Sequence, residues 1–291
     1  MTEDVAQTGE KSGEARDKRR GILAVVISAC SFATAGVLIK LVPWSALSIS
    51  AGRSLPAAIF MYVCMRVRGQ RLRINVPTLA GAAVDVAMMQ MFIMANKLTT
   101  AANAIVLQFT EPVWVILLLW LIFGTRPKRA DIIACLAVML GVVCFFFEQL
   151  SPEGMLGNIL AVASGVAYAG VFLLKKVPGC DFDSAVVLAF LACTVVGIPS
   201  LMAETAFTPT ILLCILALGV VQVGLGYLFL SIGLDSVSPV AASITSMIEP
   251  VLNPILVAIF VGETMSAPAL LGAAIILVTT LVYNVWMARR A

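Results

Sequence analysis

The sequence QFTEPVWVILLLWLIFG, residues 108–124, recurs in altered form as SMIEPVLNPILVAIFVG, residues 246–262. Both segments are apolar except for a few polar residues around a Glu-Pro pair, which contains Glu111 in the first segment and Glu249 in the second. A carboxyl group inside a membrane is costly, and a proline leaves a helix carbonyl without its usual donor. Such residues therefore usually line an interior filled by protein or water. The matching pairs indicate two related halves, and they favour a transporter.

The composition is that of a polytopic membrane protein. Apolar residues make up 61% of the 291 residues and charged residues only 12%. A soluble domain of this length would need more charged side chains to cover its surface. The chain has no histidine, and its seven cysteines show no paired metal-ligand spacing. We therefore expect no metal site and no disulfide framework.

Ten apolar segments are long enough to cross the hydrocarbon layer, which takes about 20 helical residues. Most of the short connections between them contain a proline or a glycine, which marks turns. We predict spans at 21–42, 45–65, 77–96, 101–124, 130–147, 155–175, 183–203, 210–232, 238–262 and 267–287. Residues 1–20 are polar and charged, and we expect them to form a disordered cytoplasmic tail.

The basic residues set the expected orientation. Of the nineteen lysines and arginines, all except Lys40, Arg53 and Lys97 fall in the tail, the even-numbered connections or the C-terminus. The alternate connections carry mainly acidic residues. The positive-inside rule therefore predicts that both termini face the cytoplasm.

Ten spans divide into two sets of five, residues 21–147 and residues 155–287. Because each set has an odd number of spans, the second set would cross the membrane in the opposite sense to the first. This arrangement is an inverted-topology repeat, which places a substrate site near the bilayer midplane where the repeats meet. The two Glu-Pro segments would be the fourth and ninth spans, and their prolines should bend both helices.

Two longer runs around these pairs, TTAANAIVLQFTEPVWVILLLWLIFG and SPVAASITSMIEPVLNPILVAIFVGE, resemble the EamA family of the drug/metabolite transporter superfamily. The likeness covers nearly the whole chain from about residue 21, although Thr125 stands where that family often has glutamate. Within the family the chain is most similar to the YddG-type aromatic amino-acid exporters. The resemblance implies an all-α integral membrane protein of the bacterial inner membrane that exports small metabolites without a cofactor.

The third predicted span contains an acidic residue among methionines. Asp85, Met88 and Met89 share one helical face at spacings of three and four residues. A carboxyl group beside flexible, polarizable side chains suits an adaptable pocket. We therefore predict that these residues line the transport cavity. The alternative is that Asp85 bonds to a neighbouring helix and that the methionines fill gaps in the packing.

The fourth and ninth spans carry matching polar stripes. Gln108, Glu111 and Trp114 lie on roughly one side of the fourth span, and Ser246 and Glu249 lie at corresponding positions in the ninth. We predict that all five contact substrate, with the indole stacking on an aromatic group or covering an ammonium. The alternative is that the two Glu-Pro pairs only bend and cross-link helices.

Other residues extend the predicted site or border it. Tyr168, near the middle of the sixth span, is expected to add aromatic surface to the cavity. Lys40, Arg53 and Lys97 fall towards the outer ends of their spans, where long basic side chains reach the interface. The alternative for these three is an electropositive mouth for a carboxylate.

We predict a transporter that exports small metabolites, neutral or aromatic amino acids above all, by alternating access around a midplane cavity. A multidrug or organic-cation exporter is one alternative, for which Asp85 or Glu111 would supply the counter-charge. A carrier of phosphorylated metabolites would need basic residues at mid-depth. A third alternative is a non-transporting membrane scaffold.

Other classes of function lack support in the sequence. The chain contains no nucleotide-binding glycine loop, no metal-ligand cluster and no Ser/His/Asp arrangement, so we expect no enzyme activity. The basic loops do not alternate with aromatic residues and are explained by topology, so nucleic acid is not an expected partner. The expected partners are a small-molecule substrate and the lipid bilayer, and the sequence leaves open monomer or homodimer, and coupling to protons.

Overall fold

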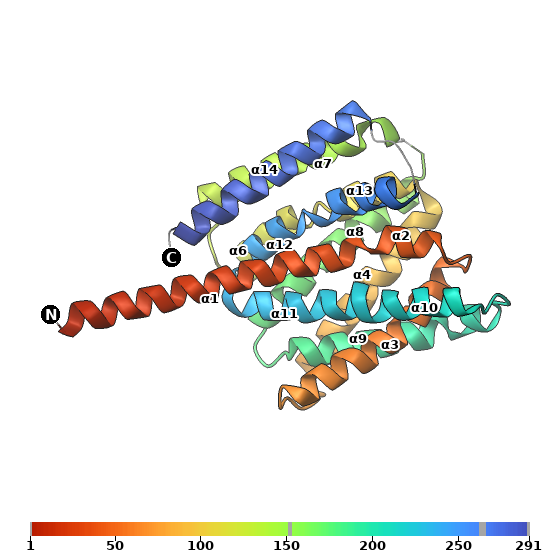
Figure 1. Ribbon diagram of the computed structural model, residues 1–291, viewed down its shortest axis with the longest axis horizontal. Coiled ribbons are helices and arrows are strands. Elements are labelled where there is room, and N and C mark those ends of the chain that lie inside the picture. Colours follow the sequence, from red (N-terminus) through yellow and green to blue (C-terminus); the bar gives the residue numbers. More distant parts are fainter. Residues whose placement is uncertain (1, 151–152, 262–265, 290–291) are drawn as a thin grey trace.

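The structure is a bundle of helices joined mostly by short connections (Figure 1). The computed structural model describes residues 2–150, 153–261 and 266–289, and these residues contain no β-strand. The first half contains α1 (Thr2–Ala33), α2 (Ala35–Lys40), α3 (Ala46–Val67), α4 (Val76–Leu98), α5 (Ala101–Gln108), α6 (Glu111–Phe123), α7 (Arg129–Phe146) and the 3₁₀ turn η1 (Phe147–Gln149). The second half contains α8 (Met155–Leu173), the 3₁₀ turn η2 (Leu174–Lys176), α9 (Phe182–Met202), α10 (Pro209–Ala217), the π-helix η3 (Leu218–Leu225), α11 (Gly226–Ser236), α12 (Pro239–Ser246), α13 (Glu249–Val261) and α14 (Ala267–Arg289).

Ten helical segments among the described residues are long and apolar enough to cross a membrane. Most of them agree with the predicted spans to within about two residues at either end; the third, for example, is Val76–Leu98. Several spans consist of successive helices, and the eighth, Pro209–Ser236, runs through α10, η3 and α11. The predicted all-α membrane fold with ten spans is confirmed.

Residues 2–20, for which the sequence predicts a disordered tail, are helical in the structure. They form the beginning of α1, whose first part extends beyond the bundle at the left of Figure 1. Glutamate, lysine, arginine and alanine are frequent here, and these residues have high helix propensity although they cannot build a core. A polar composition predicts exposure, but it does not exclude a helix that continues from a membrane span.

The two Glu-Pro spans are interrupted at corresponding places. The fourth span is divided into α5 and α6 at residues 109–110, and the ninth into α12 and α13 at residues 247–248. In each case the proline follows the first glutamate of the new helix and has no N–H to donate to the carbonyl four residues earlier. The carbonyl of Gln108 that Pro112 leaves free faces Gly165 of α8, where a Cβ atom would lie 2.7 Å from that oxygen. The glycine thus allows α8 to pack directly against the break.

The closest helix pairs join the first half of the chain to the second. The most extensive packing is between α3 and α9, α4 and α8, α7 and α14, and α1 and α11. Figure 1 shows α7 and α14 side by side at the top of the bundle, and α1 running along α11. Small residues make these approaches close: a Cβ atom at Gly272 would lie 2.5 Å from the carbonyl oxygen of Gly141. The halves are therefore interleaved and do not form two separate bodies.

Candidate functional site

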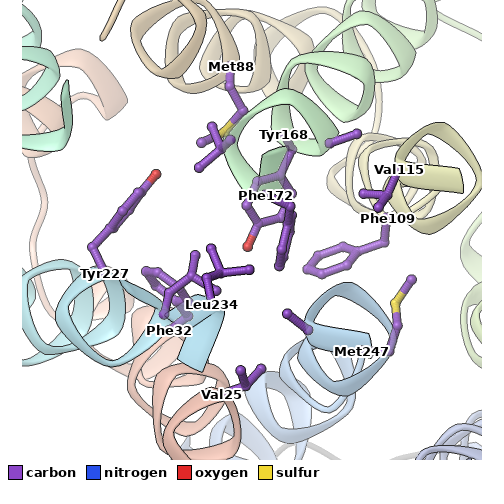
Figure 2. Close-up of a cluster of buried hydrophobic side chains, with 14 of the residues drawn as sticks. Val25, Phe32, Met88, Phe109, Val115, Tyr168, Phe172, Tyr227, Leu234 and Met247 are labelled. Atoms are coloured by element: carbon purple, nitrogen blue, oxygen red, sulfur yellow. The ribbon is translucent and has the colours of Figure 1, made fainter. Parts of the chain in front are cut away.

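The interior of the bundle contains a small set of buried polar side chains. Aromatic and aliphatic side chains of the buried core surround them, and Figure 2 shows part of this core. The polar side chains come from helices of both halves, because the paired helices bring the middle of each half to the same place. The polar set consists of Asp85, Gln108, Glu111, Tyr168, Tyr227, Ser243, Ser246 and Glu249.

Asp85 on α4 is bonded to a tyrosine of the second half. The hydroxyl of Tyr227 on α11 donates to Oδ1 of Asp85 at 2.7 Å, and Asp85 has 0% exposure. The Tyr227 ring is held edge-on by Phe32 and Phe190, with centroids 5.4 and 5.3 Å away. The second carboxyl oxygen, Oδ2, is buried without a hydrogen-bond partner among the described residues. Asp85 therefore keeps one acceptor unused in the bundle interior.

Glu111 at the start of α6 repeats this arrangement. The hydroxyl of Ser243 on α12 donates to Oε1 of Glu111 at 3.0 Å, and both residues have 0% exposure. Its Oε2 atom is again buried without a partner among the described residues. Each of these two carboxyl groups thus receives one hydroxyl from the opposite half, and each retains one free oxygen.

Glu249 at the start of α13 is less enclosed as a residue, but its Oε2 atom is buried and has no hydrogen-bond partner within the described ranges. The phenol of Tyr168 on α8 lies within electrostatic range of Glu249, Glu111 and Asp85. Tyr168 packs on Phe172, with centroids 5.1 Å apart, in the centre of Figure 2. Tyr168 therefore lies near all three carboxyl groups.

Gln108 lies next to the α4 stripe formed by Asp85, Met88 and Met89. Nε2 of Gln108 contacts the sulfur of Met88 at 3.6 Å, and both side chains are buried. The sulfur of Met89 lies 3.7 Å from the thiol of Cys193 on α9. Polarizable groups thus surround the position next to Asp85.

Two predicted site residues lie at the edge of this group. Trp114 is only partly buried; its indole N–H donates to the Thr110 hydroxyl at 3.1 Å, and its ring packs against the core. Ser246, the last residue of α12, is buried next to the break in the ninth span. The structure does not bring Trp114 into contact with Asp85.

The sequence analysis missed the hydroxyl partners of the carboxyl groups. Tyr227 and Ser243 are 142 and 132 residues away from Asp85 and Glu111, and no periodicity within one helix indicates such a pairing. The only signal was that both residues lie inside apolar spans, where a hydroxyl group has to find an acceptor.

The polar set is closed in this arrangement. Asp85 and Glu111 expose no surface, so side chains fill the space beside them and no open path reaches either carboxyl group. Within the described residues, no group of three or more histidine, cysteine, aspartate or glutamate side chains could hold a metal ion. The side chains of the polar set offer a bound solute hydrogen bonds, charge and aromatic contact.

A second polar group lies at the ends of several helices. Arg68, which directly follows α3, forms an ion pair with Asp183 of α9 at 3.4 Å, and Lys175 of η2 pairs with Asp235 of α11. A pocket of about 240 Å³ lies here, and its lining residues are Gln70, Lys175, Cys180, Asp181, Phe182, Asp183 and Asp235. These pairs join the end of α3 to α9 and η2 to α11, which carries Tyr227 of the interior set.

The profile of the EamA-like transporter family matches residues 19–147 and again residues 155–285. An uncharacterized transporter of Archaeoglobus fulgidus is 29% identical over 279 residues, which are 92% of this chain and 97% of the relative. A pseudopaline exporter, CntI, of Pseudomonas aeruginosa is 28% identical over 272 residues, or 89% of this chain and 94% of the relative. One solved crystal structure superimposes with a TM-score of 0.81 over 94% of this chain and 100% of the other, at 17% identity, and this likeness concerns the fold alone.

Proposed function

From the premise that the chain belongs to the EamA-like transporter family, we propose that it exports neutral or aromatic amino acids by alternating access. Membership of a transporter family already makes it a multi-pass membrane transporter and not an enzyme. The finer proposal concerns the substrate, the direction and the bacterial inner membrane as its location. The Pseudomonas relative is named an exporter, which supports the outward direction.

The substrate proposal rests on two buried carboxyl groups beside aromatic rings, each of which has only one of its two oxygens hydrogen-bonded to the described residues. Asp85 and Glu111 each have one bonded oxygen and one buried oxygen without a partner, and none of the described ion pairs involves either of them. An ammonium group is the complementary donor. Tyr168, Phe172 and Tyr227 offer the flat apolar surfaces on which an aromatic side chain packs.

The same contacts suggest how binding is coupled to opening. The bonds from Tyr227 to Asp85 and from Ser243 to Glu111 join the two halves in the closed arrangement. A substrate ammonium that takes the place of the Tyr227 hydroxyl would release α11 from α4 without leaving the carboxyl group unpaired. Substrate binding and the separation of α11 from α4 would then depend on the same acceptor, the Asp85 carboxyl group. Binding would thereby be linked to the conformational change of alternating access.

We further propose that residues 21–147 and 155–287 are inverted copies and that both termini face the cytoplasm. Three features support this proposal. The family profile matches the chain twice. The helix breaks lie at matching positions in the two halves. The described beginning of α1 and the described end of α14 lie at the same end of the bundle (Figure 1).

The decisive experiment is uptake of a labelled amino-acid panel into proteoliposomes, with and without a proton gradient. Asp85→Asn should lower the rate at least about tenfold, because a hydrogen bond to a charged group contributes about 1.5–3 kcal/mol. Glu148→Gln, which removes an exposed carboxyl group at the end of α7, is the matched control and should transport like the parent.

The alternatives predict other results. An organic-cation exporter would move amines without a carboxylate faster than amino acids. A scaffold would move none of the solutes while retaining a fixed protein partner through purification. If the parent and Asp85→Asn transport the panel at equal rates, the Asp85 carboxyl group has no role in transport.

A further inference from the structure

Arg53 is a cation within a membrane span, and it forms no ion pair with an acidic residue in the part of the chain that the structure describes. It lies in α3 about 10 Å along the helix from Ala46, at 1.5 Å per residue. Among the described residues, the ion pairs involve Arg20, Arg68 and Lys175, and none involves Arg53. Its Nη1 atom donates to Oε1 of Gln222 at 2.9 Å. The side chain therefore turns towards α10–α11, contrary to the expectation that it reaches the outer interface.

The partner of Arg53 lies in an unusual piece of helix. Gln222 belongs to η3, the π-helix Leu218–Leu225, and π-helical turns are rare and frequent at functional sites. A Cβ atom at Gly219 would lie 2.6 Å from the carbonyl oxygen of Arg53 and 2.4 Å from the Pro56 ring. The glycine thus lets η3 lie directly against α3, which brings the Gln222 amide to the guanidinium.

Arg53 and Asp85 both lie near Tyr227 and Cys193. Tyr227 bonds to Asp85 and lies within electrostatic range of Arg53. Cys193 is within electrostatic range of both charged groups. The two charges nevertheless do not form an ion pair, although opposite charges inside a membrane protein usually pair with each other.

Both groups keep unused bonding capacity. A guanidinium has five N–H donors in a planar fork, and to the described residues the side chain of Arg53 makes one hydrogen bond, to Gln222. Asp85 keeps its buried Oδ2 atom without a partner among the described residues. Arg53 and Asp85 thus carry opposite charges, do not pair with each other, and each retain hydrogen-bonding capacity. They are therefore complementary to a solute that carries both a positive and a negative charge.

We propose that Arg53 binds the carboxylate of a zwitterionic substrate whose ammonium group binds Asp85, with Gln222 positioning the guanidinium. The site would then select solutes that carry both a carboxylate and an ammonium, as amino acids do. The fork of Arg53 can hold both carboxylate oxygens. This inference rests on the proposed function and adds the group that distinguishes an amino acid from an amine.

Three matched probes test the proposal: phenylalanine, 2-phenylethylamine, which lacks the carboxylate, and 3-phenylpropionate, which lacks the ammonium. Their affinities would be measured on the purified full-length protein by isothermal titration calorimetry. In the parent, phenylalanine should bind at least about tenfold more tightly than either of the other two. Arg53→Gln should weaken phenylalanine and 3-phenylpropionate at least about tenfold and leave 2-phenylethylamine unchanged.

Two further variants make the result specific. Arg53→Lys keeps the charge but loses the planar fork, so it should weaken phenylalanine less than Arg53→Gln does. Lys97→Gln removes an exposed cation from the end of α4 and should bind all three probes like the parent. If Arg53→Gln does not fold, the ratio of phenylalanine to 2-phenylethylamine affinity in Arg53→Lys decides, and an unchanged ratio overturns the proposal.

The outcomes separate this inference from the proposed function. If the parent binds phenylalanine and Arg53→Gln binds it equally well, the role of Arg53 is wrong and amino-acid transport stands. If the parent binds only 3-phenylpropionate, and binding depends on Arg53, the carboxylate site stands and the amino-acid substrate is wrong. Preference for 2-phenylethylamine in both proteins would overturn both proposals.

Discussion

Tyr227→Phe removes one hydroxyl group from the bond that joins the two halves at Asp85. The ring keeps its edge-on contacts with Phe32 and Phe190, so the packing is unchanged and the loss of stability reports the O–H group. The bond is 2.7 Å long and fully buried, and its loss leaves both oxygens of Asp85 without a protein donor.

The magnitude follows from the position of this bond. Hydrogen bonds between membrane helices contribute about 0.6 kcal/mol on average and up to about 1.7 kcal/mol. A short, buried bond to a carboxyl group belongs at the upper end of this range. We expect Tyr227→Phe to lower the free energy of unfolding by about 1–2 kcal/mol.

The assay is unfolding by SDS in mixed micelles, applied to a double-mutant cycle of Tyr227→Phe and Asp85→Ala. The coupling energy between the two sites should be about 1–2 kcal/mol. Tyr62→Phe is the matched control, because Tyr62 is 42% exposed on α3, and it should change stability by less than about 0.5 kcal/mol. A coupling energy below about 0.3 kcal/mol would show that the hydroxyl does not hold the halves together and would refute the reasoning.

Three other predictions follow from the packing, the topology and the edge of the site. Gly226→Ala places a methyl group 2.5 Å from the Phe32 ring and should lower the free energy of unfolding by about 1–3 kcal/mol. A variant as stable as the parent would contradict the close contact between α1 and α11. In a background without the native cysteines, Arg71→Cys should be protected from impermeant thiol reagents in intact cells, whereas Glu153→Cys should be labelled. The reverse pattern would show that the predicted orientation is wrong. Trp114→Ala should slow uptake of aromatic amino acids more than that of small ones, whereas equal slowing would give the indole a packing role only.

The positions of the spans were predictable because each depends on the local run of apolar residues. The third span, predicted at 77–96, is Val76–Leu98 in the structure, and the helix breaks follow from the missing N–H of the prolines. The helicity of residues 2–20 was not predicted, because a polar composition is typical of disorder although the helix propensity of these residues is high.

The site was predictable only within single helices. The face shared by Asp85 and Met88 follows from helical periodicity, and the structure places both in the interior. The partners of Asp85 and Arg53 could not be predicted, because Tyr227 and Gln222 reach them from helices of the other half. Those pairs depend on how helices far apart in the sequence pack together, and the periodicity within one helix gives no information about that packing.

The interleaving of the halves has a consequence for synthesis of the protein. When α3, α4 and α6 enter the membrane, η3, α11 and α12, which carry the hydrogen-bond partners of their polar residues, have not yet been made. Until they are, Arg53, Asp85 and Glu111 lie in nascent helices without their native partners, and polar groups in that state are costly in a bilayer. We therefore expect these polar side chains to be shielded from lipid until the second half is inserted. The insertion machinery, or transient contacts among the helices of the first half, would provide this shielding.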